Sequence, residues 1–329
     1  LIGLGIWAVT ALLWSSATLP RNFFFPGPYP PDNVIYPYAD SAIWDMGGQF
    51  ALIGQGFANG DAFQDHSGYM AVLAFLHLLL GENYLRISIV QTGLLAIFPA
   101  LMYWLGKTLH SRSAGLFVAG LTIAHELNSF TASSMIDLSH ARFLLTEYPI
   151  RVGLGALALL LFVWLRAPRH NIAYAIPIGG LLGWMILLRF NTLAIPLAVM
   201  AGVILILGRD WKSWFRASLL IIISLTLVLS PWMWRSWKIS GNPLFFLEKS
   251  QRLFKENFRN RPPVTPTPPS TYSPSSQIFF ETNQFISEQP IRFNTAGRPQ
   301  NNSPLLSVPE DSPGVSQLIL SHFMHNLVA

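Results

Sequence analysis

Long apolar segments recur along this chain of 329 residues and constrain its fold more than any other feature. A helix needs about 20 mostly apolar residues to cross the roughly 30 Å hydrocarbon core of a bilayer. Seven segments approach that length: 1–19, 85–106, 114–130, 149–166, 171–188, 192–208 and 217–234. Residues 69–80 are apolar but shorter, which favours an interfacial or re-entrant helix. The pattern predicts an all-α polytopic membrane protein with about seven spans in residues 1–237.

Composition supports the membrane class. Hydrophobic residues make up 51% of the chain and charged residues only 11%, whereas soluble domains average about 25% charged residues. A net charge of +5 would suggest a nucleic-acid partner for a soluble protein. Here the placement of basic residues in cytoplasmic loops explains the charge better, so we expect no nucleic-acid partner. The absence of cysteine excludes disulfides and thiolate metal sites.

The charges of the connecting segments predict the topology. Basic residues gather in three short connectors that contain a single acid, Asp210: 107–113, 166–170 and 209–216. Eight of the ten acids in residues 1–237 lie in connectors of the opposite parity, 20–84 and 131–148. Basic loops stay on the cytoplasmic side. We therefore predict a multi-pass protein of the inner or plasma membrane with a cytoplasmic N-terminus. Its first external loop, 20–84, faces the periplasm or the exterior.

The C-terminal part has a different composition. Residues 260–315 contain eleven prolines and many Ser, Thr, Asn and Gln, too few apolar residues to offset the entropy of ordering. We expect residues 238–316 to form a Pro-rich external loop and 317–329 to begin a further helix. Because the chain starts at Leu1 inside an apolar run, it is expected to be a fragment with further spans after Ala329. A signal peptide is the alternative for residues 1–19.

Two aspartates, Asp40 and Asp45, follow the first apolar segment. Carboxylates beside a bilayer are costly unless they are solvated or functional. In a helix, residues five positions apart point about 140° away from each other. The two side chains are therefore expected to play different roles, one in a cavity and the other at a helix cap or in solvent. Asp40 is also a candidate N-cap for the run that starts at Ala42.

The surrounding pattern resembles a known family. Asp40-Ser41-x-x-Trp44-Asp45, followed by Ala51-Leu52-Ile53-Gly54-Gln55-Gly56, looks like the first external loop of the GT-C glycosyltransferases. The similar branch is bacterial and contains protein O-mannosyltransferases and lipid A aminoarabinose transferases. Further matches occur in order: His66-Ser67-Gly68-Tyr69, Leu80-Gly81-Glu82-Asn83, Gln91, Leu145-Thr146-Glu147 and Ser230-Pro231-Trp232-Met233-Trp234-Arg235. The resemblance covers about residues 1–245. Many relatives have Glu at position 41, and the Pro-rich tail has no counterpart.

The resemblance implies a GT-C-like bundle that transfers a sugar, with inversion, from a polyprenyl-phosphate lipid to a glycan, lipid or protein acceptor. Asp40 would be the general base, because a hydroxyl nucleophile needs a nearby proton acceptor. The supporting acids would be Asp45, Asp137 and Glu147, and the donor phosphate would be bound by Arg142, Arg189 and Arg235. No cofactor is certain, although Asp45 and His66 are candidates for a divalent metal.

Each assignment has a structural alternative. The arginines can extend toward lipid headgroups, and Glu147 can stabilise the positive end of a helix. Asp137 can pair with Arg142, and His77 is more simply a satisfied interfacial histidine. At the level of function, the alternatives are a transporter or flippase of lipid-linked glycans and a noncatalytic membrane scaffold. A transporter is expected to place charged residues near the bilayer midplane, whereas the acids here cluster in loops.

Overall fold

The computed structural model describes residues 1–18, 24, 36–53, 66–133, 139–168, 171–208 and 210–243. The chain divides into two compact units, Leu1–Leu247 and Glu248–Ala329. All the described residues belong to the first, which we call unit 1. Almost all of the predicted Pro-rich loop, and the helix expected after it, lie outside the described residues.

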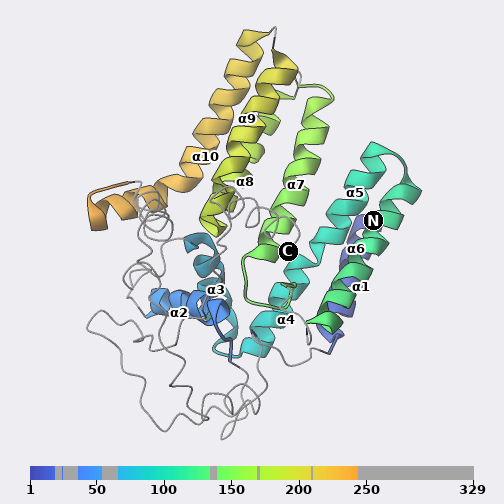
Figure 1. The fold of residues 1–329 in the computed structure, drawn as a ribbon, viewed down its shortest axis with the longest axis vertical. Helices are drawn as coiled ribbons and strands as arrows, with labels where there is room; N and C mark the ends of the chain where they lie inside the picture. Colours follow the sequence, from blue (N-terminus) through green and yellow to red (C-terminus); the bar gives the residue numbers. More distant parts are fainter. Residues whose placement is uncertain are drawn as a thin grey trace, which may run out of the picture. The chain divides into compact units, whose positions relative to one another are not determined.

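Every regular element that the structure describes is a helix, as the apolar pattern predicts (Figure 1). The α-helices are α1 (Ile2–Ser16), α2 (Asp40–Leu52), α3 (Ser67–Leu80), α4 (Tyr84–Leu95), α5 (Ile97–Leu109), α6 (Arg112–Ala132), α7 (Glu147–Leu165), α8 (Ala175–Leu188), α9 (Ala194–Leu207) and α10 (Trp211–Ser240). Two short 3₁₀ helices, η1 (Ile172–Tyr174) and η2 (Phe190–Leu193), precede α8 and α9.

Polar side chains mark where several helices begin. The side chain of Asn83 accepts a hydrogen bond from the Arg86 amide at 3.0 Å at the start of α4. Ser111 and Asp210 do the same for α6 and α10. Such caps satisfy amides that have no partner inside the helix. At its other end α10 stops at Gly241, whose φ of 71° suits glycine.

Three helical segments in the described ranges are long and apolar enough to cross a bilayer. They are Tyr84–Leu109, Glu147–Leu165 and Trp211–Lys238. Shorter apolar helices cover Ile2–Ser16, Ser67–Leu80, Ile172–Leu188 and Phe190–Ile206. The predicted segment 114–130 lies within the 21-residue helix α6, which is not among the three. A total of seven spans therefore stays a prediction.

Glycines allow two of the helix pairs to approach closely. α8 packs on α10 and α5 packs on α6. A Cβ at Gly179 would overlap the carbonyl oxygen of Ile221 in α10, and one at Gly115 would overlap that of Tyr103 in α5. Small residues at such crossings let helix backbones come into contact in membrane proteins.

The helices of unit 1 run between two ends (Figure 1). The last turns of α5, α7 and α9 lie at one end, whereas α2, α3 and the first turn of α7 lie at the other. An apolar core joins α7 to α10; its largest buried members are Leu157, Trp164, Ile178, Leu182 and Ile221. A second cluster packs α3, α4 and α8 around Tyr69 and Leu73 at the α2–α3 end. The charged residues discussed next lie mainly at that end.

Candidate functional site

Helix α2 presents its two aspartates to different surroundings. The Asp40 side chain is exposed in the first turn, whereas Asp45 is buried, with 1% of its surface accessible. This confirms that the two residues point in different directions. The prediction that Asp40 caps the helix is wrong, because Ala39 is the N-cap residue and no side chain caps this end. Ala39 has a φ of 53°, a conformation that is costly for a residue with a Cβ.

The buried aspartate belongs to a hydrogen-bonded group that we call the Asp45 network: Asp45, Gln49, His77 and Tyr84. The Asp45 Oδ1 atom lies 2.7 Å from His77 Nε2, and both side chains are 2% exposed. Gln49 Nε2 donates to Asp45 Oδ2 at 2.8 Å and to the Tyr84 hydroxyl at 2.7 Å. Both carboxylate oxygens are therefore occupied. The network ties α2 to α3 and α4.

The protonation of the network follows from its geometry. His77 Nδ1 lies 3.1 Å from the carbonyl oxygen of Gly81, which only accepts, so Nδ1 carries a hydrogen. The short contact to Asp45 then requires a second proton between Nε2 and the carboxylate. Burial lowers the pKa of His77, but the hydrogen bond and the charge of Asp45 raise it more, so that the net shift is upward. An imidazolium–carboxylate pair results.

Tyr69 connects α3 to α4 and, through Gln91, to the segment that precedes α7. Its hydroxyl donates to Gln91 Oε1 at 2.7 Å, and Gln91 in turn donates to the carbonyl oxygen of Phe143 at 2.7 Å. Burial raises the pKa of Tyr69 well above its ordinary value, and the negative charges of Glu147 and Asp45 raise it further. Tyr69 thus stays neutral between two acids. Two side chains from the family-like motifs, Tyr69 and Gln91, meet here.

Glu147 and Arg189 form an ion pair between the first turn of α7 and the end of α8. Their side chains are 29% and 28% exposed, so solvent reaches both. The N-terminal turn of α3 packs beside them, because a Cβ at Gly68 would overlap Leu187. The structure therefore brings together one predicted phosphate ligand and one predicted supporting acid. The pair is partly exposed, and the Oε2 atom of Glu147 is buried without a hydrogen-bond partner among the described residues.

The segment 139–146 holds the second predicted phosphate ligand. Arg142 is 5% exposed and donates through Nη1 to the carbonyl oxygen of Ala17, at the end of α1. Burial lowers the pKa of the Arg142 guanidinium. Nearby, burial and the positive charge of Arg142 lower the pKa of His140 to about 3. His140 is neutral and stacks on Phe143, with ring centroids 3.6 Å apart. These contacts anchor the segment to α1.

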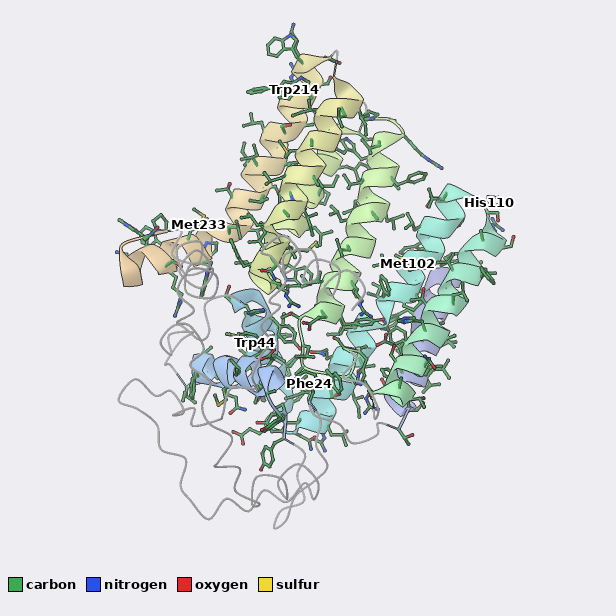
Figure 2. The ribbon with its side chains drawn as sticks, viewed as in Figure 1. Phe24, Trp44, Met102, His110, Trp214 and Met233 are labelled. Atoms are coloured by element: carbon green, nitrogen blue, oxygen red, sulfur yellow. The ribbon has the colours of Figure 1, made fainter. Side chains whose placement is uncertain are left out.

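The other predicted site residues in the described ranges, Arg235 and His66, make none of the contacts described above. The guanidinium of Arg235 lies 4.8 Å above the ring of Trp232 in α10. The ring of His66 lies 3.8 Å from that of Trp44 on α2, while Asp45 contacts His77 instead. Figure 2 labels Trp44 near α2 and α3, and Met233 on the last part of α10. Asp137 lies outside the described residues.

The described ranges contain no group of three His, Asp or Glu side chains that could hold a metal ion. Metal binding at Asp45 and His66 therefore stays a prediction. The sequence interpretation missed Gln49 and Tyr84 as partners of Asp45. The spacing of Gln49, one helical turn after Asp45, is a signal that predicts its contact. Nothing in the sequence links Asp45 to Tyr84, 39 positions later.

No family model, curated protein or solved structure matches the chain. The described part of the structure itself shows a helical chain with three segments long and apolar enough to cross a bilayer. The roles proposed for individual side chains rest on their contacts and on the order of the motifs.

Proposed function

We propose that this chain is an integral membrane glycosyltransferase of the GT-C type. It would move a sugar from a polyprenyl-phosphate lipid to a glycan, lipid or protein acceptor at the periplasmic or external face of the inner or plasma membrane. The observation that carries this proposal is the contrast on α2. Asp40 offers an exposed carboxylate, and Asp45, five residues later, anchors the same helix through buried hydrogen bonds. A positioned base on a rigid element is what hydroxyl activation needs.

In the proposed reaction, the proton acceptor and the ligands of the leaving phosphate both lie at the end of unit 1 that contains α2, α3 and the first turn of α7. Asp40 accepts the proton of the acceptor hydroxyl as its oxygen attacks the anomeric carbon of the donor. The carbon–oxygen bond to phosphate breaks on the opposite face, which inverts the anomeric centre. The leaving polyprenyl phosphate keeps the bonding electrons. Arginines that bind phosphate with two N–H groups would stabilise this charge.

Arg189 is the phosphate ligand that the contacts favour. Its side chain is 28% exposed, and within the described residues it pairs with one carboxylate, that of Glu147. A donor phosphate can therefore share the guanidinium without uncovering a buried charge. Arg142 is more enclosed and donates to the carbonyl oxygen of Ala17. We assign Arg142 first to holding the segment 139–146 beside the donor.

The competing proposal is a transporter or flippase of lipid-linked glycans. Transporters place charges near the bilayer midplane. In unit 1, Asp45, Glu147 and Arg189 gather around α3 at one end of the helices, a placement that favours chemistry at the membrane surface. The noncatalytic scaffold has no specific contact in its favour.

The test compares Asp40→Asn with the matched exposed acid Glu82→Gln. Each purified protein is mixed with a lipid extract of cells, and the product is identified by its mass. We expect Asp40→Asn to lose at least about 100-fold in transfer rate, because a lost general base costs about 10²–10⁴-fold. Glu82→Gln should transfer at the wild-type rate.

Wild-type rates from Asp40→Asn would exclude Asp40 as the base. Movement of lipid-linked glycan across vesicles without a new product would favour the transporter. Sidedness is tested by single cysteines at positions 40 and 107, because the chain has no cysteine of its own. Labelling of position 40 from the cytoplasmic side would overturn the proposed orientation.

A further inference from the structure

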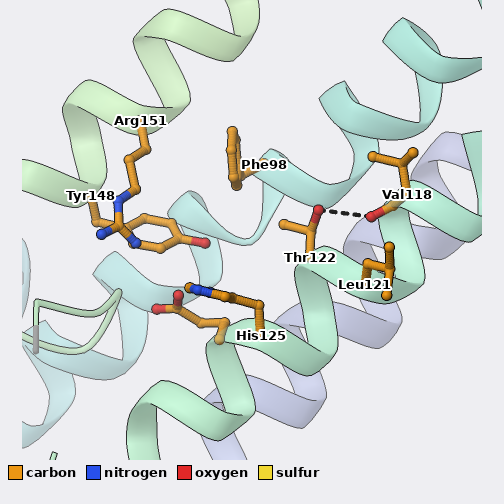
Figure 3. A pocket seen from close by; sticks show the side chains of 8 residues that line it. Phe98, Val118, Leu121, Thr122, His125, Tyr148 and Arg151 are labelled. Atoms are coloured by element: carbon orange, nitrogen blue, oxygen red, sulfur yellow. Dashed lines mark hydrogen bonds between the residues drawn. The ribbon is translucent and has the colours of Figure 1, made fainter. Parts of the chain in front are cut away.

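A cavity of about 300 Å³ lies between α5, α6 and α7, apart from the candidate site. Figure 3 shows the side chains that line it. Its apolar wall consists of Phe98, Val118 and Leu121, and its polar wall includes Glu126, Tyr148 and Arg151. Thr122 and His125 line the cavity as well, so it holds an acid, two basic side chains and a phenol and is suited to a polar ligand and not to hydrocarbon alone.

The Tyr148 hydroxyl is a buried group with no hydrogen-bond partner. Its side chain is 1% exposed, and the oxygen contacts no donor or acceptor in the part of the chain that the structure describes. Figure 3 shows the hydroxyl pointing into the space between Arg151 and Thr122. Thr122 donates to the carbonyl oxygen of Val118 at 2.8 Å, so its hydrogen is already used. An unpaired buried hydroxyl is costly unless a ligand or water satisfies it.

Glu126 and Arg151 bring an acidic and a basic side chain to the same cavity. Glu126 is 1% exposed, and its Oε1 atom accepts a hydrogen bond from the Ala141 amide at 2.6 Å. The guanidinium of Arg151 lies 5.7 Å from the centre of the Tyr148 ring. The ion pairs of the described residues do not include one between Glu126 and Arg151. A ligand that carries both charges can therefore pair with each of them.

The outer side of the cavity is formed by a helix face that is apolar and exposed. On α6, Phe117 is 67% exposed and Leu121, in the cavity wall, is 55% exposed. In a membrane protein, exposed apolar side chains of this kind contact lipid tails favourably. A ligand with hydrocarbon chains would lay them along this face of α6 while its polar head entered the cavity.

We propose that this cavity binds the zwitterionic head of an aminophospholipid. The phosphate accepts hydrogen bonds from Arg151 and the Tyr148 hydroxyl, and the primary ammonium donates to Glu126. An anionic head would gain from Arg151 but would be repelled by Glu126. A quaternary ammonium has no N–H group to give the carboxylate. The site is independent of the proposed sugar transfer.

The test is thermal unfolding of the purified chain in detergent with added phosphatidylethanolamine, phosphatidylcholine or phosphatidylglycerol. A lipid that binds the folded state raises Tm in proportion to its occupancy, which yields an apparent affinity. The wild-type protein should bind phosphatidylethanolamine at least about tenfold more tightly than either other lipid, as one additional charged hydrogen bond provides.

Three variants test the proposed contacts of Glu126, Arg151 and Tyr148 with the lipid head. Glu126→Gln keeps an acceptor for the Ala141 amide and should abolish the preference for phosphatidylethanolamine over phosphatidylcholine. Arg151→Gln should weaken the binding of both lipids about tenfold. Tyr148→Phe removes only the hydroxyl and should weaken both about threefold. Lys107→Gln, at the opposite end of α5, is the matched control and should change neither affinity.

Equal affinities of the wild-type protein for the three lipids would overturn the proposal. Tighter binding of phosphatidylglycerol would identify an anion site in place of a zwitterion site. Retention of the phosphatidylethanolamine preference by Glu126→Gln would also overturn the proposal. Because the readout is Tm and not transfer, failure here leaves the proposed glycosyltransferase untouched, and loss of transfer in Asp40→Asn leaves this site untouched.

Discussion

The apolar core between α7 and α10 and the Asp45 network between α2 and α4 are stabilised in different ways. The apolar core consists of side chains such as Leu157, Ile178 and Ile221, whose contacts have no fixed direction. The Asp45 network depends on hydrogen bonds of 2.7–2.8 Å whose donors and acceptors are each matched. The core should therefore tolerate changes that keep volume, whereas the network should fail when one partner is lost.

Removal of one partner from the network is expected to have the largest effect on stability. Asp45→Asn should lower the free energy of unfolding by about 3–5 kcal/mol, because it leaves the buried His77 without its counter-charge. The measurement is thermal or denaturant unfolding in detergent. Asp40→Asn, on the same helix but exposed, is the control and should change stability by less than about 0.5 kcal/mol.

A double variant sharpens this result. Asp45→Leu combined with His77→Leu should cost less than the sum of the two single changes, because neither charge is left alone. If the losses simply add, the pair does not act as a unit, and the contrast between the two regions disappears.

Two neighbouring glycines on α8 test how closely the apolar region is packed. Gly179→Ala should lower stability by about 1–3 kcal/mol or more, since its Cβ would overlap the backbone of Ile221 and force α8 from α10. At Gly180 the nearest atom is the Ser224 Oγ, 3.5 Å from the added Cβ. Gly180→Ala should therefore be neutral, or stabilising by up to about 1 kcal/mol through helix propensity. Equal losses would show that α8 and α10 do not cross at Gly179.

The smallest expected effect is a pH dependence that belongs to the network. The pKa of His77 is higher in the folded protein than its unfolded-state value of about 6.5. Protonated His77 therefore stabilises the folded state fully below about pH 6.5, and this contribution is lost as the pH rises through the folded-state pKa. The difference in Tm between the wild-type protein and His77→Asn should therefore shrink as the pH is raised from about 6 to about 9. The measurement is thermal unfolding of both proteins at each pH.

Comparing the wild-type protein with His77→Asn separates the effect of His77 from that of His140, whose pKa shifts in the opposite direction. The pKa of His140 is lowered to about 3, so its neutral buried form loses stability as pH falls below about 6.5. Both proteins keep His140, so its contribution cancels in the difference. A difference in Tm that did not vary with pH would show that His77 keeps one charge state over this range.

Local features of the sequence predicted much of the helical framework. The expected segment 85–106 lies within Tyr84–Leu109, and 217–234 lies within Trp211–Lys238. Apolar length is a property of consecutive residues and needs no knowledge of distant contacts. The different environments of Asp40 and Asp45 likewise follow from the helical repeat of 3.6 residues.

The partners of these residues could not be predicted in the same way. Asp45 bonds to His77, 32 positions later, and Gln91 donates to the carbonyl of Phe143, 52 positions later. Such pairs depend on how helices cross, and crossing depends on small residues such as Gly48, where an added Cβ would lie 3.0 Å from the Ala74 amide. The N-cap of α2 was misplaced by one residue, because helix ends depend on local backbone angles that side-chain preferences only bias.

The sequence by itself determined that the chain is helical, apolar and suited to a membrane, and that its two aspartates differ. Only the tertiary structure decided which aspartate is enclosed, which histidine protonates beside it, and which acid and base face the cavity of Glu126 and Arg151. The physical reason is that hydropathy and helical periodicity are sums over neighbouring residues. Hydrogen bonds and charges act between atoms that only folding brings within a few ångströms.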